Sequence, residues 1–119
     1  MADETTTTSE VEPERAAELL EAGAELIDVR RPYEWDAGRI EGARHLELNQ
    51  LADEAESIPR ERPVIFYCRT GSRSSLAAAA FRESGWEAYN LEGGIEVWAK
   101  SGRGLDPPDG EVAGPRPGS

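Results

Sequence analysis

The pattern of hydrophobic positions predicts short strands that alternate with helices. Three short, mainly apolar runs predict strands, at residues 25–29, 63–67 and 86–91. Three stretches with apolar residues at helical spacing predict helices, at residues 13–22, 49–57 and 75–84. The run at 63–67 is apolar throughout, which is typical of a strand that is covered on both faces in a parallel sheet. Strands that alternate with helices imply an α/β layer fold with right-handed crossovers.

The segments between these elements are less regular. Pro13 fits the first turn of a helix, where its missing N–H is not needed. Residues 32–38 form a loop with one possible helical turn, and residues 43–48 are an ambiguous short strand. A last short helix follows the turn at Gly93 and Gly94.

Both ends of the chain differ in composition from the middle. The sequence has 24 acidic and 13 basic residues, a net charge of −11, and residues 1–14 and 105–119 carry most of this excess. Residues 1–11 are acidic with almost nothing apolar, and residues 105–119 are rich in proline and glycine, as is typical of disordered tails. We therefore expect one folded domain at residues 12–104 between two tails.

The charge and the cysteine count argue against several classes of function. A nucleic-acid backbone and an anionic membrane both repel an acidic surface, so neither is expected as a partner. One cysteine excludes an internal disulfide and a cysteine zinc cluster, and it fits a reducing compartment. No apolar run approaches the roughly 20 residues that span a bilayer, and no secretory signal is visible. The expectation is a soluble, cytoplasmic protein.

One turn carries the candidate chemistry. Cys68 follows the most apolar strand and precedes a helix, at the sheet edge where α/β folds bind ligands. The turn continues as Arg69, Thr70, Gly71, Ser72, Arg73 and Ser74. Backbone N–H groups at a helix N-terminus favour the thiolate, which is the reactive form of cysteine. The arginines can bind an oxyanion, the hydroxyl groups add donors, and the glycine lets the backbone approach a ligand closely.

The composition and length of this turn separate several interpretations. A lone cysteine at the end of a buried strand is more often an inert core residue, but such a residue has no use for two arginines and three hydroxyl groups. Phosphotyrosine-type phosphatases cradle phosphate with a Cys-x5-Arg loop, whereas four residues separate Cys68 from Arg73 here. The shorter ring suits a sulfur atom carried on the cysteine better than a phosphoryl group.

Beyond this turn, the sequence resembles the single-domain rhodanese-like sulfurtransferases. Four segments carry the resemblance in the right order: residues 26–30 with their Asp-x-Arg, residues 34–43, residues 68–74, and residues 90–98 with their Gly-Gly and Trp. The resemblance implies a rhodanese-like α/β fold, with a parallel sheet of about five strands and helices on both faces.

The resemblance also implies a mechanism. Cys68 is the nucleophile that takes a sulfane sulfur from thiosulfate or a similar donor and becomes a persulfide. Residues 69–74 bind the donor, and Asp28 and Arg30 support the loop or the sheet edge. No metal and no organic cofactor is needed. The expected partners are a small anionic sulfur donor and an acceptor that is cyanide or a thiol, including a protein thiol.

A few residues depart from the family pattern or lack a catalytic role. Arg39 and Glu41 replace the usual His and Pro of a loop, and we expect the fold and chemistry to survive. The sole histidine, His45, is interpreted as a packing residue, and Trp35 and Trp98 as core or pocket-wall residues.

Two alternative functions remain open at the level of the sequence. One is a rhodanese-like module that only binds a partner or relays sulfur. The other is a phosphatase or arsenate reductase of the same broad fold, against which the short loop argues.

Overall fold

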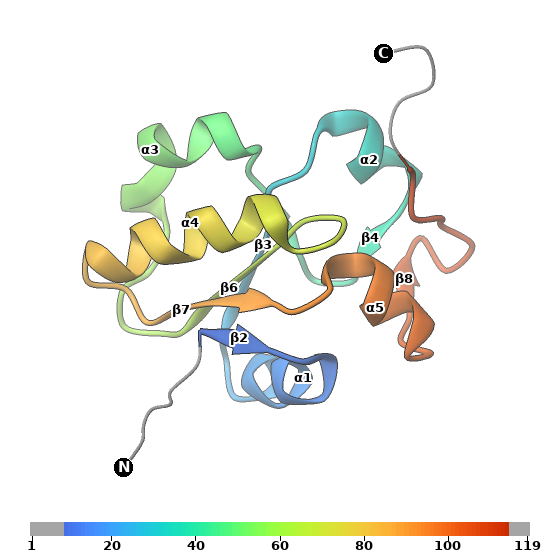
Figure 1. Cartoon of the computed structure of the whole chain (residues 1–119), viewed down its shortest axis with the longest axis horizontal. Helices are drawn as coiled ribbons and strands as arrows, with labels where there is room; N and C mark the ends of the chain where they lie inside the picture. Colours follow the sequence, from blue (N-terminus) through green and yellow to red (C-terminus); the bar gives the residue numbers. More distant parts are fainter. Residues whose placement is uncertain (1–8, 115–119) are drawn as a thin grey trace.

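The apolar run around Ile65 forms the central strand of a parallel sheet. The computed structural model describes residues 9–114. Within them, five strands follow the order β2-β7-β6-β3-β5, and every neighbouring pair is parallel (Figure 1). In chain order they are β2 (Glu10–Val11), β3 (Glu25–Asp28), β5 (Arg44–His45), β6 (Val64–Tyr67) and β7 (Ala88–Leu91). The expected sheet of five parallel strands is confirmed.

Helices cover both faces of this sheet (Figure 1). One face packs against α1 (Pro13–Glu21) and α5 (Gly94–Lys100). The other packs against α3 (Leu51–Glu54) and α4 (Ser72–Glu83), and the short 3₁₀ helices η1 (Leu48–Gln50) and η2 (Ala55–Ser57) flank α3. The remaining helix, α2 (Pro32–Ala37), follows the carboxyl end of β3. The predicted α/β architecture is therefore also confirmed.

Two separate cores explain why β6 is apolar throughout. Val64 and Phe66 belong to the core under α3 and α4, whereas Ile65 and Tyr67 belong to the core under α1 and α5. All four side chains are fully buried. Burying a large apolar side chain contributes on the order of 2 kcal/mol, so both faces of the strand stabilise the fold. Cys68 continues the alternation and joins the core under α4.

The structure corrects the predicted N-terminal tail. Glu10–Val11 form β2 at the edge of the sheet instead of belonging to a disordered segment. The N–H of Asn90 donates to the carbonyl of Ser9 (2.7 Å), and the N–H of Glu92 donates to that of Val11 (2.8 Å). Val11 is also buried, so backbone pairing and apolar contact together order residues that the acidic composition assigned to a tail.

The predicted C-terminal tail is corrected in the same way. Leu105–Asp106 form β8, which pairs antiparallel with β4 (Arg39–Ile40), a strand that the sequence pattern does not predict. Further along, the N–H of Glu111 donates to the carbonyl of Ala37 (2.8 Å). Residues 1–8 and 115–119, which were also predicted to be tails, lie outside the described residues.

Two predicted elements are shorter or more broken than expected. The helical stretch at 49–57 is divided among η1, α3 and η2. The predicted strand at 86–91 begins only at Ala88, because the ring of Trp86 turns into the core against Phe81 and its Nε1 donates to the carbonyl of Ile58 (3.2 Å).

Candidate active site

The turn after β6 folds around the thiol of Cys68. Gly71 has a φ of 104°, in the left-handed region that favours glycine. The helix α4 begins directly after it, at Ser72 rather than at the predicted Ser75. Ser72, Arg73 and Ser74 therefore form the first helical turn, whose N–H groups have no partner within the helix and can bind another acceptor.

Hydrogen-bond donors surround the buried sulfur of Cys68. The N–H of Gly71 donates to Sγ at 3.1 Å, and the hydroxyl oxygen of Ser74 lies 3.4 Å from it. Burial raises the pKa of the thiol. The Ser74 hydroxyl and the backbone N–H groups of Ser74, Gly71 and Arg73 outweigh burial and hold the pKa of Cys68 below its ordinary value. The site therefore favours the thiolate, which is the nucleophilic form.

Asn90 of β7 joins the loop to the sheet behind it. Its Oδ1 lies next to the Ser74 hydroxyl, whose single proton is shared between this oxygen and Sγ of Cys68. Its Nδ2 donates to the carboxylate of Glu10 (2.9 Å) and the carbonyl of Gly71 (3.1 Å). Because both partners of Nδ2 only accept, the amide orientation is fixed. No role is predicted for Asn90 from the sequence, although a polar residue inside a buried strand is a signal that could indicate one.

The turn at Gly93 and Gly94 brings α5 against the back of the loop. The N–H of Ile95 donates to the carbonyl of Cys68 (2.9 Å). Gly94 has a φ of 62°, and a Cβ at this position would collide with the carbonyl oxygens of Cys68 and Arg69. Glycine is therefore required at this close approach.

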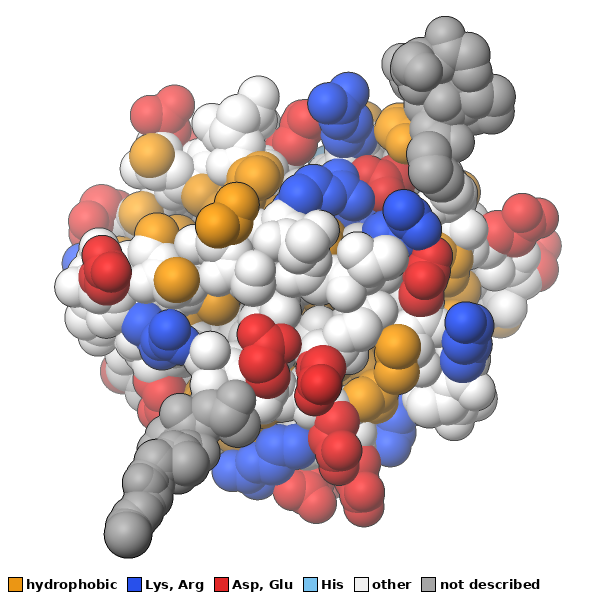
Figure 2. Space-filling model, viewed as in Figure 1, with side chains coloured by type: hydrophobic (Ala, Val, Ile, Leu, Met, Phe, Trp, Pro, Cys, Tyr) orange, Lys and Arg blue, Asp and Glu red, His pale blue; other side chains and the backbone are white. Residues whose placement is uncertain are grey.

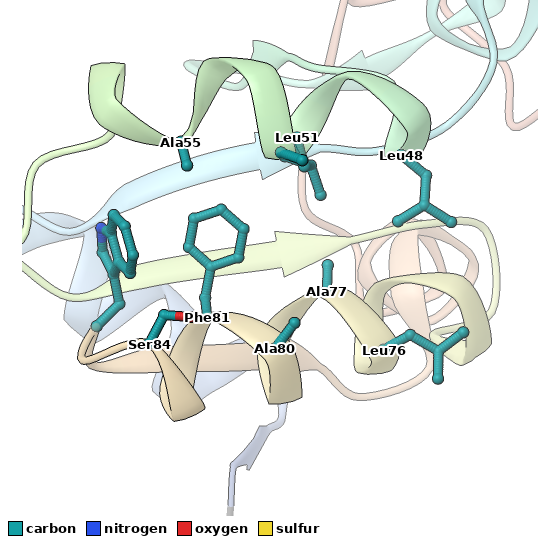
Figure 3. Close-up of a pocket in the computed structure, with 10 residues that line it drawn as sticks. Leu48, Leu51, Ala55, Leu76, Ala77, Ala80, Phe81 and Ser84 are labelled. Carbon is teal, nitrogen blue, oxygen red and sulfur yellow. The ribbon is translucent and has the colours of Figure 1, made fainter.

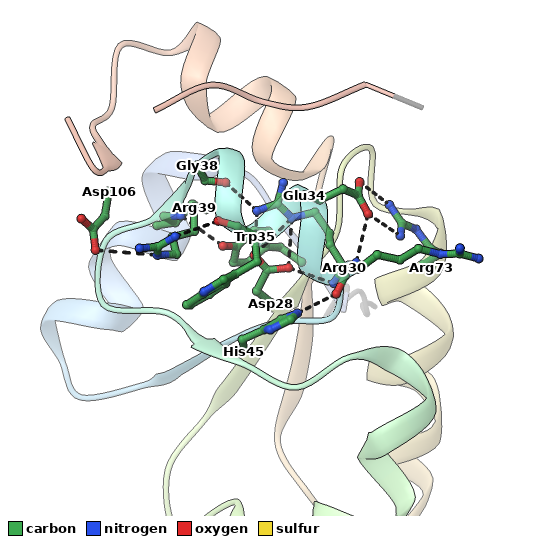
Figure 4. Close-up of polar contacts among 12 residues, drawn as sticks. Asp28, Arg30, Glu34, Trp35, Gly38, Arg39, His45, Arg73 and Asp106 are labelled. Atoms are coloured by element: carbon green, nitrogen blue, oxygen red, sulfur yellow. Dashed lines mark hydrogen bonds and ion pairs between the residues drawn. The ribbon is translucent and has the colours of Figure 1, made fainter. Parts of the chain in front are cut away.

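Both arginines of the loop form ion pairs with carboxylates. Arg69 pairs with Glu96 of α5, and Arg73 donates two hydrogen bonds of 3.0 and 3.1 Å to Glu34 of α2 (Figure 4). The sequence predicts these arginines as donor-binding residues but does not predict their partners. No local pattern could reveal them, since they lie 27 and 39 residues away in the chain.

The ion pair between Arg73 and Glu34 shifts the pKa values of both side chains, and the thiol of Cys68 lies close enough to contribute. Burial raises the pKa of Glu34, but the hydrogen bonds from Arg73 and from the N–H of Arg31 hold it below the usual range. The hydrogen bond to Glu34 raises the pKa of Arg73, and the charge of Cys68 adds to this effect. Arg73 therefore lies between a buried carboxylate and the thiol of Cys68, and it remains cationic.

A second arginine pair lies deeper in the same corner (Figure 4). The carboxylate of Asp28 accepts hydrogen bonds from Nε (3.0 Å) and Nη2 (2.8 Å) of Arg30, and Nη2 also donates to the carbonyl of Gly38 (2.8 Å). Both side chains are fully buried. The pair ties the end of β3 to the end of α2. The supporting role expected for these two residues stays a prediction.

Comparison with known proteins agrees with this geometry. A model of the rhodanese-like domain family matches residues 12–101. The chain belongs to the rhodanese-like family. It is 36% identical over 89 residues to the thiosulfate sulfurtransferase GlpE of Pseudomonas aeruginosa, covering 74% of this chain and 81% of that protein. It is 45% identical over 76 residues to the uncharacterized protein YqhL of Bacillus subtilis, covering 63% of this chain and 60% of that protein.

Solved structures share the rhodanese-like fold. A rhodanese homologue from Thermus thermophilus superimposes with a TM-score of 0.62 at 32% identity, covering 73% of this chain and 96% of the other. A rhodanese-related protein from Thermoplasma volcanium reaches a TM-score of 0.76 at 24% identity, covering 81% and 95%. The rhodanese-like fold expected from the sequence is confirmed.

The other residues singled out in the sequence take different places in this rhodanese-like domain. Thr70 and Ser72 are exposed on the outside of the loop. His45 stacks on Trp35 with ring centroids 4.8 Å apart, and its Nε2 donates to a backbone carbonyl 2.7 Å away. Trp98 is buried in the core under α1 and α5. The contacts of His45 and the two tryptophans agree with the packing roles expected for them.

Two hollows lie on the side of the sheet that α3 and α4 cover, and one of them reaches the loop at residues 68–74. The first, here called the loop pocket, has a volume of about 430 Å³ and is lined by Val29, Arg31, Glu47, Leu48, Asn49 and Arg73. The second, the apolar groove, has a volume of about 390 Å³ and lies between α3 and α4 (Figure 3). Leu48 lines both, and Leu76 and Phe81 are among the other residues of the groove. Because the loop pocket includes Arg73, it is the candidate site for a small molecule.

The described part of the chain contains neither a cluster of metal-binding side chains nor a helix that could span a membrane. Within residues 9–114, no group of three or more His, Cys, Asp or Glu side chains is placed to hold a metal ion. None of the helices in the same range has the length and hydropathy needed to span a bilayer.

Proposed function

We propose that this protein is a sulfurtransferase that moves a sulfane sulfur from thiosulfate, or a similar small anionic donor, to a thiophilic acceptor through a persulfide on Cys68. The observation that carries this proposal is the set of donors directed at Sγ from Gly71 and the first turn of α4. The same donors can share the negative charge of a persulfide once a second sulfur is attached. The similarity to GlpE, a thiosulfate sulfurtransferase, supports the same type of reaction.

The first half-reaction loads the cysteine. The Cys68 thiolate attacks the outer sulfur of thiosulfate, and a new S–S bond forms between Sγ and that sulfur. The S–S bond within thiosulfate breaks, and its electron pair leaves with sulfite. The negative charge of the thiolate moves to the terminal sulfur of the persulfide. The total charge is unchanged, so neither a proton nor an external oxidant is consumed.

The second half-reaction returns the cysteine to its starting form. An acceptor thiolate or cyanide attacks the terminal sulfur, the bond between the two sulfurs breaks, and the electron pair returns to Sγ. The products are an acceptor persulfide or thiocyanate and the Cys68 thiolate. Cys68 is the only cysteine of the chain, so the acceptor is a second molecule.

The geometry favours this reaction over the alternatives. A phosphatase loop of the Cys-x5-Arg type encloses a phosphoryl group with three oxygens, whereas only four residues separate Cys68 from Arg73, and this shorter ring suits a single sulfur atom on the cysteine better. A module that only binds a partner has no need for a thiol whose pKa is lowered. A sulfur relay to a protein thiol uses the same two half-reactions and differs only in the acceptor.

Intact-mass spectrometry after incubation with thiosulfate tests this proposal. We expect the wild-type protein to gain the mass of one sulfur atom, and cyanide to remove that sulfur as thiocyanate. The matched variant Cys68→Ser should gain nothing, because it lacks the only thiol. A wild-type protein that takes no sulfur from thiosulfate or any other sulfane donor would contradict the proposal and favour the binding-module alternative.

A further inference from the structure

The loop pocket contains a cation whose charge is not already matched by a carboxylate. Arg69 and Arg73 are paired with Glu96 and Glu34. Within residues 9–114, Arg31 forms no ion pair, and it is exposed where it lines the pocket. Its guanidinium is therefore available to an anion that enters from solvent.

The two arginines of the loop, Arg69 and Arg73, are less available to such an anion than Arg31 is. The carboxylate of Glu34 is only 3% exposed, and moving Arg73 away would leave this buried charge unpaired, which is strongly unfavourable. Arg69 does not belong to the residues that line the loop pocket. The positive charge that a ligand in this pocket can use thus lies on Arg31.

The path of the backbone places this pocket next to the turn that contains Cys68, although Cys68 itself does not line the pocket. Val29, two residues before Arg31, donates its N–H to the carbonyl of Tyr67 (3.0 Å) and belongs to the same core as Cys68. Val29 and Arg73 both line the loop pocket. Basic side chains gather on this face over α2 and the start of α4, next to apolar side chains (Figure 2). The pocket therefore opens where β3 and β6 end.

We propose that Arg31 binds the anionic end of the sulfur donor while the outer sulfur of the donor faces Cys68, an inference that rests on the proposed function. The planar fork of a guanidinium matches two oxygens of a sulfonate-like group. Glu47 lines the same pocket, forms no ion pair within residues 9–114, and repels any second anionic group. The pocket thus selects a compact donor with its charge at one end, such as thiosulfate, over donors that carry additional carboxylates.

Thiosulfate binding to the Cys68→Ser protein tests this inference, because the donor can bind there without transferring its sulfur. In calorimetric titrations at low ionic strength, Arg31→Gln should weaken binding about tenfold, the factor typical of one charge-assisted hydrogen bond. Arg31→Lys should restore part of the affinity because it keeps the charge but not the fork. Glu47→Gln should tighten binding, since it removes a repelling charge.

Arg82→Gln is the matched control. Arg82 is also exposed and also lacks an ion pair within residues 9–114, but it lies in the last turn of α4, at the opposite end of the helix from the loop. Its substitution should leave thiosulfate affinity unchanged. Circular dichroism checks that each variant is folded.

Two results would overturn the role of Arg31. One is an Arg31→Gln variant that binds thiosulfate as tightly as its parent, and the other is a parent that binds no thiosulfate. In the protein with Cys68, Arg31→Gln should raise the KM for thiosulfate and leave kcat nearly unchanged. Failure of the proposed function is distinguishable, because the protein would then bind thiosulfate through Arg31 and still gain no sulfur.

Discussion

Two arginine–carboxylate pairs lie in the same corner of the molecule and differ in how deeply they are buried (Figure 4). Both side chains of the Asp28–Arg30 pair are 0% exposed. In the Glu34–Arg73 pair the carboxylate is buried, but the guanidinium is 34% exposed. The first pair ties β3 to the end of α2, and the second ties α2 to the loop around Cys68.

The difference in burial suggests that the same kind of ion pair affects mainly stability in one place and mainly the ionisation of a neighbouring thiol in the other. In the fully buried pair each charge depends entirely on the other, because no water can replace a lost partner. In the loop pair, losing Arg73 leaves the buried Glu34 carboxylate unpaired, whereas losing Glu34 leaves only a guanidinium that water still reaches, the partly exposed side chain of Arg73. Its charge, however, acts on the neighbouring thiol. We therefore expect the first pair to govern stability and the second to govern reactivity.

The largest expected effect is the loss of stability in Arg30→Met. The substitution leaves the buried Asp28 carboxylate unpaired, and removing one partner of a buried pair costs about 3–5 kcal/mol of unfolding free energy. Urea unfolding measures this loss. The double variant Asp28→Leu, Arg30→Met should recover much of it, because no buried charge remains. A loss below about 1 kcal/mol in the single variant would mean that the buried pair behaves like an exposed one.

A smaller effect, on the pKa of Cys68, should distinguish the two members of the loop pair. Glu34→Gln removes the anion that balances Arg73, so the pKa of Cys68 should fall. Arg73→Gln leaves the Glu34 carboxylate without its cation, so the pKa of Cys68 should rise. The pH dependence of alkylation by iodoacetamide reports this directly, because Cys68 is the only cysteine. Shifts of the same sign would refute a direct action of this pair on the thiol.

The smallest expected effect is a pH-dependent difference in stability between the wild type and Cys68→Ser. The pKa of Cys68 is lowered in the folded protein, so ionisation of the thiol favours folding. The stabilisation is complete above the unfolded value of about 8.5 and is lost as the pH falls through the folded pKa. The free energy of unfolding of the wild type, relative to the variant, should therefore increase with pH across this window. A constant difference would mean that the loop does not stabilise the thiolate.

The central strand and the turn that contains Cys68 could be predicted from local sequence. Four consecutive apolar residues predict the buried strand β6, and the cysteine and glycine that follow predict the turn after it. The apolar pattern predicts a start of α4 that is three residues too late, because Ser72, Arg73 and Ser74 show no apolar periodicity, although serine is common at the beginning of helices.

The short edge strands and the partners of the loop could not be predicted in this way. The strands β2 and β8 have two residues each, too few for any periodicity, and they form because distant backbone groups pair with them. Glu34, Glu96 and Asn90 reach the loop only through the folded topology. The local sequence therefore identifies Cys68 and its nearest hydrogen-bond donors, while the carboxylates that pair with the loop arginines come from tertiary structure.

The hydrogen bond from Asn90 to Glu10 extends the functional unit beyond the usual limits of the domain. The family match begins at residue 12, after the whole of β2. A domain that is cut at that boundary would lose the edge strand and leave Nδ2 of Asn90 without its carboxylate acceptor, although the same Nδ2 holds the carbonyl of Gly71 in the loop around Cys68. A shortened version of this domain that keeps the edge strand β2 and the Glu10 carboxylate therefore has to start at or before Ser9.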